Sequence, residues 1–184
     1  SRVVLDVLGV EDFGIYDVVG GVAAMFSFLN AAMSSGTQRF LSYELGRNNL
    51  EQCKRVFSVT LTIHLGIALA IFFIAQTIGI WFLNHRLNIP SVRMEAAQWV
   101  FQLAVLSTLA SVVQIPYTAS IIAHEQMNIY AYVSIIEVSL KLAVVFILSW
   151  SDFDKLKLYA SLMFGVTLVV SLIYRFYCKR KFSV

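Results

Sequence analysis

Residues Val56–Asn84 read VFSVTLTIHLGIALAIFFIAQTIGIWFLN, without a single Lys, Arg, Asp or Glu. A hydrocarbon core about 30 Å thick needs roughly 20 helical residues to cross it, and this stretch is long enough. Because no water is available there to satisfy bare backbone groups, a crossing segment has to be helical. We therefore predict a transmembrane helix over this stretch.

Similar stretches lie on both sides of it. Three more lack charged residues, namely Val18–Gln38, Ala96–Ala123 and Leu158–Tyr174, and a fourth, Met127–Ser151, carries only Glu137 and Lys141. A chain of 184 residues that is 59% hydrophobic has too much surface to bury all of them in a soluble core. We predict an all-α, polytopic transmembrane bundle with a partial first helix and five full helices. The spans are expected at residues 1–10, 18–42, 56–84, 96–123, 127–151 and 157–178, in an internal fragment of a larger membrane protein.

The basic residues predict an orientation. Eight of them fall at one set of helix ends: Arg39, Arg47, Lys54, Arg55, Arg175, Lys179, Arg180 and Lys181. Four fall at the opposite ends: Arg86, Arg93, Lys155 and Lys157. The positive-inside rule places the richer side in the cytoplasm, and we call it the inner end. The acidic segment Gly9–Asp17 is then expected to be a loop at the outer end.

Polar side chains form stripes along several spans. Ser27, Asn30, Ser34 and Gln38 are three or four residues apart and share one helical face. Two further spans repeat the spacing, with Ser107, Ser111, Gln114 and Thr118 in one and Tyr130, Ser134, Glu137 and Lys141 in the other. Such residues can simply join helices by hydrogen bonds in lipid. Several stripes in one bundle instead favour a hydrated cavity, so Asn30, Gln38 and Gln114 are candidate substrate contacts.

Charges at membrane depth are the most costly feature of the chain. Glu137 and Lys141 are spaced i and i+4 with the acid first, the favourable order for a helical ion pair. One interpretation is a pair that only neutralises itself, and the other is a cavity site in which Lys141 contacts an anion and Glu137 orients it. Arg2 either extends toward the interface or adds a second cavity cation. Pro116 is a candidate hinge, or else it only shapes the packing of its helix.

The sequence contains no complete constellation of catalytic or cofactor-binding residues. Cys53 and Cys178 have no metal-binding spacing, and we expect neither a metal nor a cofactor. Asp152-Phe-Asp154 has the DxD form of a metal-dependent glycosyltransferase, so a membrane enzyme acting on lipid-linked sugars remains the weakest alternative. The basic residues lie at helix ends rather than in one surface patch, which argues against nucleic-acid binding.

Three segments resemble one family. Ser1–Tyr16, SRVVLDVLGVEDFGIY, is similar to the first helix end and outer loop of bacterial polysaccharide (O-antigen, lipopolysaccharide) flippases. Gln38–Arg47 resembles the cytoplasmic end of their second helix, and Ile121–Asn128 resembles the tight hinge between their fourth and fifth helices. The family belongs to the superfamily that also contains the multidrug and toxin extrusion exporters.

This resemblance implies two helical lobes facing a central cavity, of which the chain would supply the N-terminal one and lack the C-terminal one. It implies a multi-pass protein of the bacterial cytoplasmic membrane, surrounded by membrane lipids, that transports lipid-linked oligosaccharide by alternating access and is not an enzyme. Cationic cavity residues would bind the substrate pyrophosphate, a role that suits Arg2 and Lys141. The alternative within the same fold is an organic-cation antiporter, for which Asp6 and Glu137 are the candidate acids.

Overall fold

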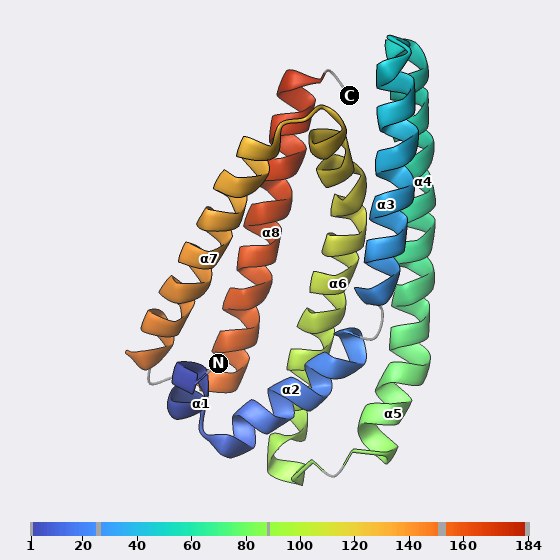
Figure 1. The fold of residues 1–184 in the computed structure, drawn as a ribbon. Coiled ribbons are helices and arrows are strands. Elements are labelled where there is room, and N and C mark those ends of the chain that lie inside the picture. Colours follow the sequence, from blue (N-terminus) through green and yellow to red (C-terminus); the bar gives the residue numbers. More distant parts are fainter. Residues whose placement is uncertain (1, 25–26, 88, 151–153, 183–184) are drawn as a thin grey trace.

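The computed structural model describes residues 2–24, 27–87, 89–150 and 154–182, although the side chains of residues 2, 3, 22–24, 27–29 and 31 are not described. All regular structure in these ranges is helical, so the predicted all-α bundle is confirmed (Figure 1). The elements are α1 (Arg2–Leu8), α2 (Val10–Ala24), α3 (Ser27–Gly46), α4 (Leu50–Ile74), the π-helical segment η1 (Ala75–Gly79), α5 (Ile80–His85), the 3₁₀ turn η2 (Ser91–Arg93), α6 (Met94–Ala123), α7 (Met127–Ser149) and α8 (Lys155–Lys181).

The N-terminal third differs from the sequence prediction. The outer segment Gly9–Asp17 is not a loop, because α2 begins at Val10. Gly9 ends α1 with a positive φ of 83°, a conformation that suits a residue without Cβ. Glu11 and Asp12 occupy the first turn of α2, where negative charge is favoured by the helix dipole. The single span expected at residues 18–42 is therefore divided between α2 and α3, which run in different directions in Figure 1.

Helix α6 lies at the centre of the bundle and packs against α2, α3, α4, α7 and α8 (Figure 1). Small residues allow this close approach, because without a hydrophobic driving force helices in lipid associate through tight backbone packing. Ala97 and Ala119 are fully buried, at the outer and inner ends of α6 respectively. Ala119 belongs to a buried cluster with Leu41 of α3 and Phe57 of α4, and Val112 belongs to a second cluster with residues of α4 in the middle of the bundle.

Two tight turns close the inner end of the bundle. After α3, the backbone N–H groups of Asn48 and Asn49 return to the carbonyls of Leu45 and Glu44, with Asn48 at φ 54°. After α6, Glu125 and Gln126 repeat the pattern, with Glu125 at φ 57°. These pairs of hydrogen bonds form the Schellman motif, in which a helix ends at one residue in the left-handed conformation. That residue is usually Gly, but here it is Asn48 or Glu125.

Four helical segments in the described chain are long and apolar enough to cross a membrane: Leu50–His85, Ser91–Ala123, Met127–Ser149 and Lys155–Lys181. They support a multi-pass membrane protein.

Candidate functional site

The polar residues of α3 lie beside its packing face. Thr37 and Leu41 are buried, whereas Asn30, Ser34 and Gln38 are half-buried. Gln38 donates from Nε2 to Ser34 Oγ at 3.1 Å, and Oδ1 of Asn30 is buried without a hydrogen-bond partner among the described residues. The two candidate amides therefore lie on one flank of α3, with the Gln38 side chain partly exposed and the Asn30 carbonyl oxygen buried.

The stripe on α6 is half-exposed along its length, even though α6 is the central helix. Ser111 Oγ and Thr118 Oγ1 donate to the carbonyls of Ser107 and Gln114, at 2.9 and 3.5 Å. These hydroxyls are therefore paired with their own helix backbone. Pro116 is fully buried, and α6 stays helical on both sides of it, so the hinge role remains a prediction.

Glu137 and Lys141 form an ion pair on α7, with Lys141 Nζ 2.6 Å from Glu137 Oε1. Their side chains are 38% and 46% exposed. Side chains four residues apart on an α-helix point in directions about 40° apart around its axis. Glu137 is therefore about 40° around α7 from the buried Val133, and Lys141 is a further 40° around. The pair thus lies along one side of the α7 packing face, close to the bundle.

The structure does not join all the candidates in one contact network. Helix α3 packs on α4 and α6, whereas α7 packs on α8, α6 and α1, and Figure 1 shows α6 and α8 between α3 and α7. In the described part of the chain, no hydrogen bond links the α3 amides to the α7 ion pair. The side chain of Arg2 lies outside the described residues, so its cavity role stays a prediction.

A polar contact that the sequence analysis did not predict lies near the outer end. Gln76 in η1 and Gln102 in α6 exchange two hydrogen bonds, at 2.7 and 3.1 Å. Beside them the ring of Phe101 in α6 packs directly on the backbone of Gly79, because a Cβ added to Gly79 would lie 2.5 Å from Cζ of Phe101. π-Helical turns occur mostly as single-turn insertions in α-helices, often at functional sites. The sequence signal was a Gln in each of two spans that lack charged residues.

An ionic cluster joins three elements at the outer end. Arg93 reaches Asp12 of α2 at 2.9 Å and Asp154, the N-cap of α8, at 3.2 Å. Asp12 is 7% exposed and lies outside the four candidate spans. Burial raises the pKa of its carboxyl above the ordinary value, while the Arg93 guanidinium opposes that rise and the Asp154 carboxylate adds to it. Of the DxD pair, Asp154 therefore has a structural role, and Asp152 lies outside the described residues.

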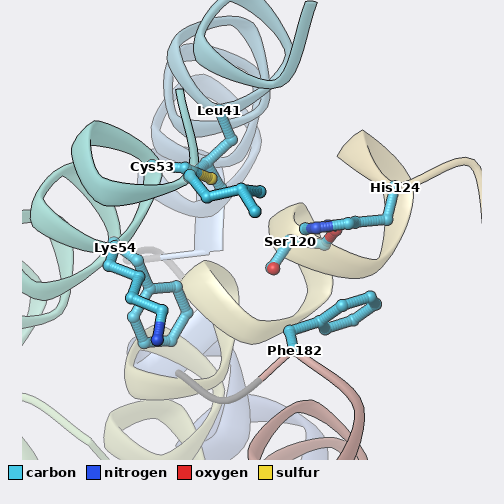
Figure 2. Close-up of a pocket in the computed structure, with 8 residues that line it drawn as sticks. Leu41, Cys53, Lys54, Ser120, His124 and Phe182 are labelled. Carbon is cyan, nitrogen blue, oxygen red and sulfur yellow. The ribbon is translucent and has the colours of Figure 1, made fainter. Parts of the chain in front are cut away.

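The inner end contains a pocket of about 260 Å³ between α3, α4, α6 and the residue that follows α8 (Figure 2). The lining residues are Leu41, Leu50, Cys53, Lys54, Phe57, Ser120, His124 and Phe182. His124 Nδ1 donates to the Ser120 carbonyl at 2.7 Å, and its ring stacks on Phe182 with centroids 3.9 Å apart. The imidazole is therefore fixed in place.

A bundle of apolar helices with partly exposed polar stripes and an ion pair at membrane depth is a membrane protein rather than a soluble domain, and charges at that depth are typical of transport proteins. No cluster of metal ligands occurs among the described residues. The chain matches the MatE family model over residues 1–147, most of its length, and so belongs to this family of membrane exporters within the multidrug/oligosaccharidyl-lipid/polysaccharide exporter superfamily. No curated protein and no solved structure shows detectable similarity to it.

Proposed function

We propose that the chain forms the N-terminal lobe of an exporter that moves lipid-linked oligosaccharide across the bacterial cytoplasmic membrane by alternating access. In this proposal a C-terminal lobe closes a cavity against the polar flanks of α3, α6 and α7. The hydroxyl and amide groups on those flanks, with Asn30, Gln38 and Gln114 among them, suit the hydroxyl-rich surface of a sugar. The lipid tail stays in the bilayer during transport.

The observation that carries the proposal is the exposed ion pair on α7. A charge at the membrane centre costs roughly 3 kcal/mol on insertion scales, and intramembrane charges almost always face a bundle interior or a water-filled cavity. Lys141 is the more exposed partner of the pair, with its side chain 46% accessible. It can therefore offer a fixed cation to the pyrophosphate of a lipid-linked sugar, and Arg2 is the proposed second cation.

The test is to replace Lys141 by Ala and, separately, by Arg in the complete protein. Surface polysaccharide is then measured at matched protein levels. We expect loss of polysaccharide with Ala and recovery with Arg, because Arg preserves the charge and binds phosphate well. Normal polysaccharide with Lys141→Ala would reduce the pair to a structural role.

An organic-cation antiporter is the second candidate, because Glu137 is an acid at membrane depth. Its charge is matched by Lys141 at 2.6 Å, which weakens its attraction for a cationic drug. The antiporter predicts that Glu137→Gln abolishes efflux of a fluorescent organic cation while Lys141→Ala leaves or improves it. The flippase predicts no effect of either substitution on that efflux.

A further inference from the structure

The inner-end pocket lies outside the proposed transport path. It is formed where the α3–α4 turn approaches the end of α6 and the residue after α8, and none of the α7 residues lines it. The orientation predicted from the basic residues puts it at the depth of the cytoplasmic headgroups. A ligand at this depth would lie beside the lipid headgroups and the adjoining first part of the lipid tails.

The polar atoms of the pocket favour an anion. Lys54 brings an ammonium group and Ser120 a hydroxyl, and none of the described residues that line the pocket carries a carboxylate. Figure 2 shows Lys54 and His124 on opposite walls with Ser120 between them. Because the Ser120 carbonyl can only accept, Nδ1 of His124 carries the proton of their hydrogen bond, and Nε2 of the neutral ring is a hydrogen-bond acceptor.

The remaining lining is apolar. Leu41 and Phe57 are buried in the contact of α3 and α4 with α6, whereas Leu50 at the start of α4 is 65% exposed. A site that combines cationic and apolar walls fits an amphiphile better than a free inorganic ion. Its volume of about 260 Å³ is several times the ~30 Å³ that one water occupies in the liquid.

We propose that this pocket binds the phosphate group of an anionic phospholipid from the inner leaflet. Lys54 contacts the phosphate, Ser120 donates a hydrogen bond to it, and Leu41, Leu50 and Phe57 hold the glycerol and the first part of the acyl chains. Basic pockets between transmembrane helices on the cytoplasmic side recognise lipid headgroups in this way. The bound lipid would join the α3–α4 turn to the end of α6.

The matched control is the next residue in the chain. Arg55 has the same charge, lies at the same depth and is exposed like Lys54, yet it does not line the pocket. A diffuse attraction of the basic surface to anionic lipid would depend on both residues equally. A specific site depends on Lys54 alone.

Binding is measured by native mass spectrometry of the purified protein titrated with phosphatidylglycerol, with phosphatidylcholine and with inorganic phosphate. We expect one tight phosphatidylglycerol site that weakens about tenfold or more in Lys54→Gln, since a hydrogen bond to a charged group is lost. Lys54→Arg and Arg55→Gln should stay close to the unmodified protein. Equal losses in Lys54→Gln and Arg55→Gln, equal binding of phosphatidylcholine, or binding of inorganic phosphate without the lipid would overturn the proposal.

Cys53 provides a second readout, because it lines the pocket and is a free thiol. Bound phosphatidylglycerol should slow its modification by a small thiol reagent. Cys178 is also free but fully buried elsewhere in the bundle, and it serves as the internal control. Unchanged modification of Cys53 at saturating phosphatidylglycerol would place the lipid outside the pocket and refute the assignment.

Discussion

Replacing Gly79 by Ala tests the close contact between η1 and α6. The new Cβ would lie 2.5 Å from Cζ of Phe101 and 3.4 Å from both neighbouring ring carbons. In an open site the tip of a phenyl ring could turn away. Phe101 is only 2% exposed, between Ala75, Leu83 and Ala97, so the ring has little room to move.

Two opposing effects set the change in the free energy of unfolding caused by Gly79→Ala. Overpacking a tight core typically costs 1–3 kcal/mol, whereas Ala in place of a helical Gly recovers about 0.5–1 kcal/mol. We expect Gly79→Ala to lose about 1–2 kcal/mol, or roughly 2–8 °C in unfolding temperature for a chain of this size. Gly66→Ala is the matched control, because nothing lies within 4 Å of its added Cβ. That control should be slightly more stable than the unmodified protein.

The assay is thermal unfolding in detergent, followed with a dye that becomes fluorescent on reacting with thiols. Cys178 is free and fully buried, so its reaction with the dye reports unfolding. Phe101→Leu removes the tip of the ring, and Gly79→Ala should cost little in that background. If Gly79→Ala unfolds at the same temperature as Gly66→Ala, the reasoning about this contact is wrong.

Three further substitutions test local features. Arg93→Gln should lose more stability at pH 7 than at pH 4. Burial already raises the pKa of the Asp12 carboxyl, and loss of the Arg93 guanidinium raises that pKa further. The variant is therefore destabilised as the pH rises through the pKa and the buried carboxyl ionises without its partner. Equal losses at both pH values in thermal unfolding would contradict this. Asn49→Ala removes the side-chain cap that accepts from Gln52 N–H at 3.1 Å, and it should cost about 1 kcal/mol in denaturant unfolding. Glu125→Gly should gain about 1 kcal/mol by relieving the left-handed backbone at φ 57°, and Glu125→Ala should show no such gain.

The sequence predicted the helical class because hydropathy over a whole span is a local property. The Glu137–Lys141 pair could also be predicted, since an i and i+4 spacing fixes two side chains on one helix face. The start of α2 could not be placed from hydropathy. Its first turn is acidic, so the segment looked like a loop, whereas the structure pairs Asp12 with Arg93 from a distant part of the chain.

The inner-end pocket escaped prediction for a similar reason. Lys54 and His124 are far apart in the sequence, and each has an ordinary explanation as a residue at a helix end. Only the packing of α3 and α4 against the end of α6 brings them to opposite walls of one pocket (Figure 2). Contacts between helices depend on how each helix is rotated about its axis, which a single sequence constrains weakly.

The Gln76–Gln102 pair has a consequence for how this family can vary. Each amide satisfies the other, so changing one to an apolar residue leaves the remaining half-buried amide without its partner, at a cost of about 1–3 kcal/mol. Changing both to apolar residues of similar shape is nearly neutral by the same reasoning. Across relatives, the two positions are therefore expected to carry either two amides or two apolar side chains, and to be inherited as a linked pair.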